Sequence, residues 1–120
     1  MTTETILATT VYGTPSGNYD GSSQDWVSDA VKAAAYYRGQ GSTQTVLFTV
    51  TGFEGTMHLE ATLDTDPDQA GWFDAFVYGD GSSIPLTDYH PETVLGNFTW
   101  MRVRVEGFSG GTINTVTITY

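Results

Sequence analysis

Apolar and polar residues alternate along four stretches of the chain, at residues 45–51, 55–63, 98–106 and 112–120. In the second stretch Met57, Leu59, Ala61 and Leu63 fall on one side and Thr56, His58, Glu60 and Thr62 on the other. A period of two is typical of a strand with one buried face, so we expect packed antiparallel strands. Residues 5–12 and 72–78 predict further strands, and Gly-, Asp- and Ser-rich turns are expected at 51–55, 64–68, 79–83 and 109–111. The pattern predicts a single all-β domain over residues 1–120, an antiparallel, jelly-roll-like β-sandwich of seven or eight strands.

One segment fits the strand pattern less well. Residues 25–38 contain several alanines, and Trp26, Ala30 and Ala34 form an i, i+4 stripe, which taken alone indicates a short helix. With a period of two, the same residues form a strand. We favour extended structure because a Gly-rich turn follows and the neighbouring segments are strands.

Charge narrows the possible partners. The 120 residues include 14 Asp and Glu against 4 Lys and Arg, a formal net charge of −10, and no Cys. Such an acidic chain is unsuited to binding the phosphates of a nucleic acid or an anionic membrane surface. We therefore expect neither nucleic acid nor membrane as a partner. The lack of Cys excludes disulfides and zinc–cysteine sites.

The clearest candidate metal ligands lie in an acidic turn. Asp64, Asp66 and Asp68 resemble the opening of a calcium loop, because hard cations need several closely spaced oxygens. The rest of that pattern fails, since Pro67 interrupts it and Ala75 occupies the place of the bidentate Glu. We therefore favour solvated turn residues over bound calcium, and expect no other cofactor.

Catalytic motifs are missing from the sequence. It contains neither a Gly-x-Ser-x-Gly elbow nor a His-Glu-x-x-His motif, and His58 alternates with apolar residues on the polar side of a predicted strand. His90 precedes Pro91 in the turn-like stretch 87–91. We do not expect an enzyme.

Aromatic residues in predicted connections are candidate contact residues. Tyr19, Tyr36, Tyr37 and Tyr89 could stack on sugar rings, and they would suit a protein–protein contact equally well. For Trp26, Trp72 and Trp100 we favour a place in the core, as is usual for large aromatic side chains.

Arg102 and Arg104 stand two apart on one predicted strand, so their side chains are about 7 Å apart on one face. They could clamp a carboxylate on a neighbouring subunit or pair with Glu60 or Glu106 across the same sheet. The sequence leaves both alternatives open.

A set of spaced motifs resembles small β-sandwich virion proteins and domains of tailed bacteriophages, particularly marine ones. The motifs are Phe53-Glu-Gly55, Leu59-Glu-Ala-Thr-Leu-Asp64, Trp72-Phe73, Gly96-Asn-Phe-Thr-Trp-Met-Arg-Val-Arg-Val105 and Phe108-x-x-Gly111-Thr-Ile113, within residues 43–120. The resemblance implies a structural part of a virion: a head decoration, neck, baseplate or fibre-associated protein. It also implies a homo-oligomer or multi-copy assembly with other virion proteins. The competing hypothesis is a carbohydrate-binding module for host glycans, possibly with calcium, because jelly-roll carbohydrate-binding domains end in a similar strand.

Overall fold

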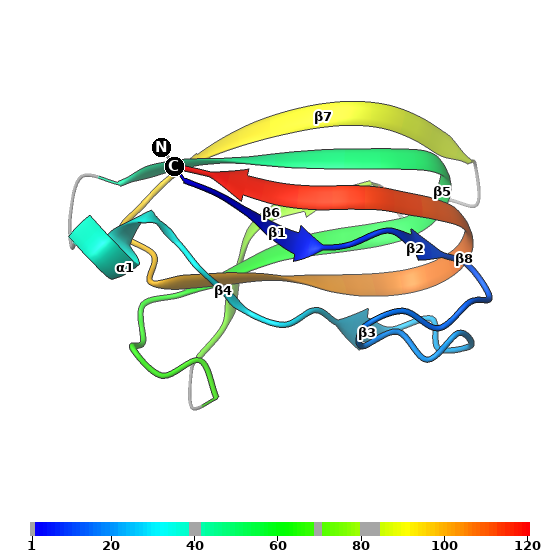
Figure 1. Ribbon diagram of the computed structural model, residues 1–120, viewed down its shortest axis with the longest axis horizontal. Coiled ribbons are helices and arrows are strands. Elements are labelled where there is room, and N and C mark those ends of the chain that lie inside the picture. Colours follow the sequence, from blue (N-terminus) through cyan, green and yellow to red (C-terminus); the bar gives the residue numbers. More distant parts are fainter. Residues whose placement is uncertain (1, 39–41, 69–70, 80–84) are drawn as a thin grey trace.

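The computed structural model describes residues 2–38, 42–68, 71–79 and 85–120, and consists almost entirely of strands (Figure 1). Strands make up 64% of the chain and helix 4%. The elements are β1 (Thr3–Leu7), β2 (Thr10–Val11), β3 (Trp26–Val27), β4 (Val31–Lys32), α1 (Ala34–Arg38), β5 (Thr43–Thr62), β6 (Phe73–Tyr78), β7 (Leu86–Leu95) and β8 (Trp100–Thr119). Every strand pairing among them is antiparallel. The all-β antiparallel fold is confirmed.

Two strands of 20 residues each, β5 and β8, form the centre of the sheet. They pair along most of their length, from Thr45 opposite Thr119 to Thr62 opposite Trp100. The four predicted strands at 45–63 and 98–120 are therefore two, and the turns predicted at 51–55 and 109–111 lie inside them.

Glycines bend these strands without reversing them. The register of β5 and β8 shifts between Thr49 and Thr56, and Gly111 has a φ of +84°. A Cβ at Gly111 would overlap the carbonyl oxygen of Gly52, so the two backbones approach too closely for any side chain there. Because both strands carry glycines at this level, they bend together as bulged strands and keep their pairing.

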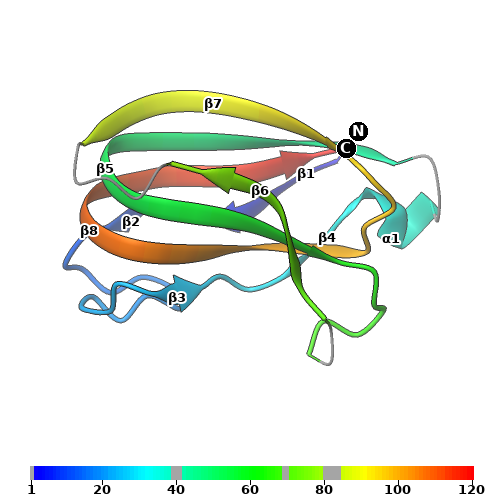
Figure 2. The ribbon, with the colours of Figure 1, turned by 180° about the vertical axis from the view of Figure 1, so that it is seen from behind.

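The bend folds the sheet over on itself (Figures 1 and 2). On one side of the bend, β7 pairs with β5, and β1 and β2 pair with β8; on the other, β6 pairs with β5, and β3 and β4 pair with β8. All eight strands thus belong to one sheet. The expected sandwich of two separate sheets is not confirmed.

The core lies between the two halves. It contains the inward residues of every alternating stretch, among them Val46, Phe48, Val50, Met57, Leu59, Ala61, Met101, Val103, Val105, Ile113, Val116 and Ile118. Phe48 from one half stacks on Tyr78 from the other, with ring centroids 4.7 Å apart. Leu63 was expected inside but is 63% exposed, because β5 ends one residue before it.

Residues 25–38 combine both expected conformations. Two short strands, β3 and β4, extend along β8, and the segment ends in the five-residue helix α1. Buried Gln44 fixes this helix: its Oε1 accepts a hydrogen bond from the Ala34 amide at 3.3 Å, and its Nε2 donates to the Val94 carbonyl at 2.7 Å. Nothing in the local pattern of 25–38 reveals this distant partner.

Residues 87–91, expected to be turn-like, lie in strand β7. Pro91 is tolerated because, among the described residues, β7 pairs only with β5, so no second strand there needs the missing amide. The predicted turn at 79–83 lies mostly outside the described residues.

The folded sheet has two outer faces, which differ in chemistry. The neutral face is made by the outward residues of β1, β7, the first half of β5 and the second half of β8. The charged face is made by the outward residues of β6, the second half of β5 and the first half of β8, and carries His58, Glu60, Asp74, Arg102, Arg104 and Glu106.

Candidate functional site: an aromatic cluster on the surface

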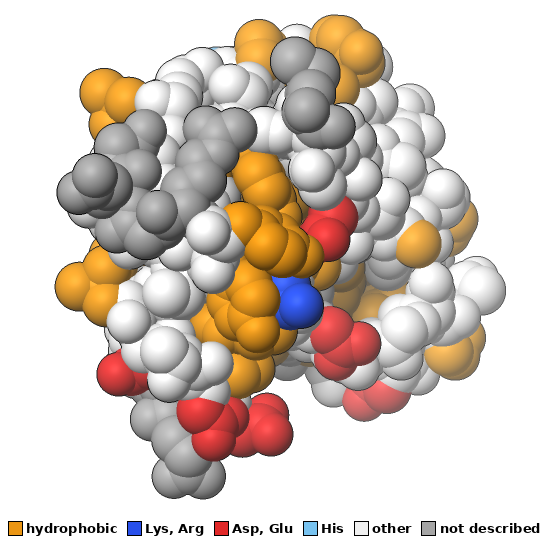
Figure 3. Space-filling model, turned by 60° about the vertical axis from the view of Figure 1, so that its left-hand side comes forward, with side chains coloured by type: hydrophobic (Ala, Val, Ile, Leu, Met, Phe, Trp, Pro, Cys, Tyr) orange, Lys and Arg blue, Asp and Glu red, His pale blue; other side chains and the backbone are white. Residues whose placement is uncertain are grey.

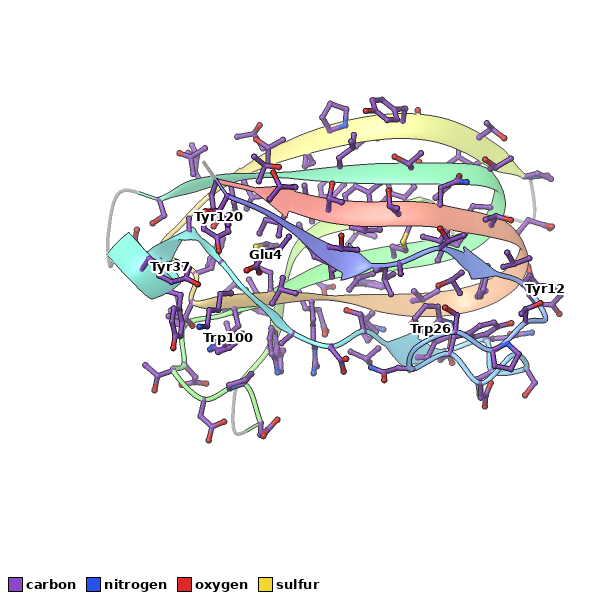
Figure 4. The ribbon with its side chains drawn as sticks, viewed as in Figure 1. Glu4, Tyr12, Trp26, Tyr37, Trp100 and Tyr120 are labelled. Atoms are coloured by element: carbon purple, nitrogen blue, oxygen red, sulfur yellow. The ribbon has the colours of Figure 1, made fainter. Side chains whose placement is uncertain are left out.

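Four aromatic rings meet beside helix α1, from segments far apart in the sequence. Tyr36 contacts Tyr37 and Trp100 edge to face, with centroids 5.2 and 5.3 Å apart. Tyr37 in turn lies 6.4 Å from Tyr120. We call Tyr36, Tyr37, Trp100, Tyr120 and Lys32 the aromatic cluster; Figure 4 shows Tyr37, Trp100 and Tyr120 gathered at this end of the molecule.

Lys32 places a positive charge against two of these rings. Its Nζ lies 4.4 Å from the centroid of Tyr36 and 5.5 Å from that of Tyr37, within the range of a cation–π interaction. Figure 3 shows a cation at the edge of a hydrophobic patch on this side of the protein, with acidic side chains on its other side. The charge is thus partly shielded by rings in a protein that is otherwise strongly acidic.

Hydrogen bonds hold the cluster to the framework. The Tyr120 hydroxyl donates to the Lys32 carbonyl at 3.0 Å, and Trp100 Nε1 donates to the Thr65 carbonyl at 3.0 Å. Burial, with smaller effects of Glu4 and Tyr37, raises the pKa of Tyr120 to about 12, so this hydroxyl stays protonated well above neutral pH. Tyr120 and Trp100 are therefore held in place by hydrogen bonds, and Tyr36 and Tyr37 pack against them.

The cluster nevertheless remains open to solvent. Tyr37 is 62% exposed and Tyr36 41% exposed, while Trp100 and Tyr120 are half-buried. Tyrosine and tryptophan rings held rigidly at a surface offer a large contact area at a small cost in conformational entropy. This arrangement is suited to binding another surface.

The structure divides the four predicted contact tyrosines. Tyr36 and Tyr37 lie together in the cluster, as their spacing suggested. Tyr19 was expected in an exposed connection, and that expectation is wrong: it is 1% exposed, and its hydroxyl accepts a hydrogen bond from the Gly13 amide. Its ring packs 5.2 Å from both Trp26 and Phe108, so the core needs it.

Tyr89 is well exposed but belongs to a different surface. It lies on β7 opposite Thr49, within the neutral face. That position is four residues, about 13 Å, along β7 from the row that contains Thr119, next to Tyr120. The four tyrosines therefore do not form one glycan platform.

The three tryptophans also have different environments. Trp26 is in the core, as predicted. Trp100 and Trp72 are half-buried on the outside, where the core interpretation fails because both side chains face away from the interior. Trp72 instead stacks under Arg102, whose guanidinium carbon lies 4.2 Å from the ring centroid.

Arg102 and Arg104 pair within their own sheet. Both donate from Nε to Glu60, at 2.8 and 3.2 Å, and Arg104 also reaches Glu106 at 3.1 Å. Burial lowers the pKa of Arg104, but hydrogen bonds to Glu60 and Glu106 outweigh it and raise that pKa above its usual value. The cross-strand alternative is thus the observed one, and a clamp on a neighbouring subunit stays a prediction.

The acidic turn uses its oxygens locally. Asp64 accepts a hydrogen bond from the Gly71 amide at 2.7 Å, and Asp66 accepts one from the Asp68 amide at 3.0 Å. These are turn-stabilising bonds, as the favoured interpretation expected. In the parts of the chain that the structure describes, no group of three or more acidic or histidine side chains is placed to hold a metal ion, and calcium binding at Asp64, Asp66 and Asp68 stays a prediction.

A shallow groove runs beside the aromatic cluster. It encloses about 440 Å³ and is lined by Asn18, Asp29, Pro67, Asp68, Trp72 and Arg102, among others. Arg102 is two residues from Trp100 on the same strand, so the groove and the cluster lie on neighbouring parts of the surface.

Sequence reasoning missed three members of the cluster. Trp100 was expected in the core, and neither Lys32 nor Tyr120 was singled out as a contact residue. The i, i+4 spacing of Lys32 and Tyr36 is the one signal in the sequence that could have joined two of them. Their meeting with Trp100 and Tyr120 depends on the long-range pairing of β4 with β8.

Together, fold and site define an antiparallel all-β protein with a pre-packed aromatic surface. Among the described residues, no helix is long and apolar enough to cross a membrane. Comparison of the chain with protein-family models, curated proteins and solved structures finds no match. The resemblance to phage proteins therefore rests on the sequence motifs.

Proposed function

We propose that the protein is a non-enzymatic structural subunit of a bacteriophage virion and acts through protein–protein contacts. It takes its place in the particle, in several copies, by docking the aromatic cluster against neighbouring virion proteins. The observation that carries this proposal is the cluster itself: Tyr36 and Tyr37 are exposed, yet held by Trp100, Tyr120 and Lys32.

Energetics support a contact role for this surface. Rings that are already packed lose little freedom when a partner covers them, so most of the gain from burying their apolar area is retained. Tyrosine and tryptophan are also the residues that most often dominate protein interfaces. Lys32 adds a single favourable charge for an acidic neighbour.

The phage-like motifs support the other half of the proposal, because they build the framework beneath this surface. Gly55 and Gly111 lie at the bends, and Trp72 and Arg102 stack on each other. Trp100 belongs to both the motif and the cluster. A framework built from these motifs that presents an aromatic surface is consistent with a virion subunit that neighbouring subunits hold in place.

The test is the composition of purified particles. Particles carrying the chain should retain it at a fixed ratio to the major capsid or tail protein through density-gradient purification, as measured by mass spectrometry. Tyr37→Ala should lower that ratio severalfold, and Val77→Ala, an exposed apolar residue on β6, should leave it unchanged. A chain found only outside the particles, or equal loss in both variants, would refute the proposal.

The second candidate is carbohydrate binding, favoured by the groove next to the cluster. In the groove, Trp72 offers a flat apolar surface, and Asn18, Asp29 and Asp68 offer hydrogen-bond partners for hydroxyl groups; the tyrosine rings of the aromatic cluster lie on the neighbouring surface. A glycan array, run with and without calcium, tests this. Sugar binding that Tyr37→Ala abolishes and Tyr89→Ala preserves would favour this candidate, and an array without reproducible binding would reject it.

A further inference from the structure

The neutral face presents ordered rows of hydroxyl groups. The first row crosses four strands through Thr3, Thr119, Thr45 and Thr93. The next row contains Thr5, Thr117, Leu47 and Pro91, and the third contains Thr115, Thr49 and Tyr89. None of these positions carries a charge, although the chain as a whole has a net charge of −10.

The charges of these strands occupy the opposite positions. Glu4 pairs in register with buried Ile118, Asp88 with buried Val50, and Glu92 with buried Val46, so all three alternate with the outward threonines. The strands therefore place their carboxylates toward the inner side and the margins, and keep the outer side neutral. Hydroxyl groups on a wet sheet face are common, but they do not require the exclusion of every charge.

Many of the hydroxyls on this face are already paired. Thr3 Oγ1 lies 3.1 Å from Thr119 Oγ1, Thr45 Oγ1 lies 3.0 Å from Thr93 Oγ1, and Thr51 donates to Asn114 Oδ1 at 2.8 Å. A hydroxyl with a partner on its own face loses less when water is removed than one without. The methyl groups of the same threonines then supply apolar contact.

We propose that the neutral face is a self-association surface on which a second copy of this chain docks. Two copies of a molecule with charge −10 repel each other wherever carboxylates meet, and the neutral face brings none together. A two-fold arrangement places the same flat sheet on both sides, as in face-to-face sheet packing. This surface is separate from the aromatic cluster, so the inference does not depend on the proposed function.

The area of the neutral face determines how strongly we expect two copies to associate. Four strands by nine residues of β5 cover roughly 500 Å² per copy. This is smaller than the ~800 Å² per partner of a standard stable interface, so we expect a reversible dimer with a dissociation constant in the micromolar range or weaker. Neighbouring subunits in an assembly would add to it.

Sedimentation velocity of the purified chain tests the proposal. The average mass should rise from 13.0 kDa toward twice that value between micromolar and millimolar concentration. Raising the salt from about 0.05 to about 0.5 M should strengthen association, because it screens the repulsion between two acidic copies.

Thr117→Lys places a charge in the middle row of the face and should weaken dimerisation at least tenfold. The matched control is Val77→Lys, which makes the same change in net charge on an exposed residue of β6 and should leave dimerisation intact. Circular dichroism confirms that both variants fold. A chain that stays monomeric up to millimolar concentration in high salt, or equal effects of the two lysines, would overturn the proposal. Tyr37→Ala should not alter dimerisation, so failure of this proposal and of the proposed function can be told apart.

Discussion

The neutral and charged faces are built on the same two strands. On one side of the bend, β5 and β8 turn threonines outward, at Thr45, Thr49 and Thr117. On the other side, the same strands turn Glu60 and Arg104 outward, cross-linked by ion pairs. Inward apolar residues alternate within each half, and the alternation shifts by one residue at the bulges of the bend, as from Val50 to Phe53.

This comparison shows that the inward pattern and the outward chemistry are independent. The core requires only that every second side chain be apolar, so the other positions are free to differ. On the charged face the arginines form ion pairs within the chain, where Glu60 pairs with both Arg102 and Arg104. The neutral face has no charged side chain at its outward positions, and its Tyr89 is exposed.

The largest effect should come from the bend that separates the two faces. Gly111→Ala would force a Cβ into the Gly52 carbonyl at a positive φ, and should lower the free energy of unfolding by about 4 kcal/mol or prevent folding. Gly107→Ala is the matched control: it also has a positive φ, but open space around its Cβ position, and should cost about 1 kcal/mol. Urea unfolding followed by circular dichroism measures both. Equal losses would show that close approach at Gly111 is unimportant.

Next in size is the centre of the charged face. Glu60→Gln removes the carboxylate that holds two half-buried guanidinium groups, and should cost about 2 kcal/mol. Glu106→Gln removes a 55% exposed side chain from the same network, and should cost less than about 1 kcal/mol. If chemical denaturation gives the two variants the same stability, Glu60 is not the centre of the network.

The hydrogen bonds of the Tyr120 and Tyr78 hydroxyls, which join the two halves of the sheet, should make stability fall at high pH. The fold raises the pKa of Tyr120 to about 12 and that of Tyr78 above its usual value, the latter through burial and the hydrogen bond to Asp88. Since the folded protein favours the neutral phenols, their stabilisation is complete below pH 10 and is lost as the pH rises from about 10 to 12 and beyond. Urea midpoints from about pH 9 to 12 should fall in the wild type.

Tyr120→Phe should flatten part of that fall, because the residue that titrates between these limits is gone. It should also lower stability at neutral pH by about 1 kcal/mol through loss of the bond to the Lys32 carbonyl. Tyr89→Phe, on the exposed edge strand, is the control variant. A slope unchanged by Tyr120→Phe would contradict the role given to that hydroxyl.

The smallest effect belongs to the hydroxyl pairs of the neutral face. Thr45→Val breaks the pair with Thr93 on a solvent-exposed surface, and should change stability by about 0.5 kcal/mol. Thr43→Val, one row away and opposite Leu95, provides the comparison. A double-mutant cycle of Thr45 and Thr93 measures the coupling directly, and a coupling of zero would remove the pairing argument for this face.

Much of the fold was predictable because strand periodicity is a local property. The inward residues of both long strands, from Val46 to Ile118, follow from alternation in the sequence. The turns predicted at Gly52–Gly55 and Gly110–Gly111 are bends within strands, because glycine occurs at a bend as readily as at a chain reversal. Which of the two occurs depends on whether the strands on either side share a partner, and that partner is distant in sequence.

The candidate site was predictable only in part. Tyr36 and Tyr37 are neighbours in the chain, so their common position needed no tertiary information. Tyr19 and Tyr89 share their chemistry and lie elsewhere, one within the core and one on the neutral face. Residue type alone does not distinguish an exposed ring from a buried one.

By itself, the sequence determined the all-β class, the inward side of each strand, the acidic character and the local use of the aspartates at 64–68. Only the tertiary structure decided that the strands form one folded sheet and that Lys32, Tyr36, Tyr37, Trp100 and Tyr120 meet. It also decided that the uncharged positions of four strands fall on one face. The physical reason is the distance along the sequence over which each interaction acts. The alternation of side chains and the hydrogen bonds of turns involve residues a few positions apart, whereas a surface is assembled by pairing strands that are distant in the sequence.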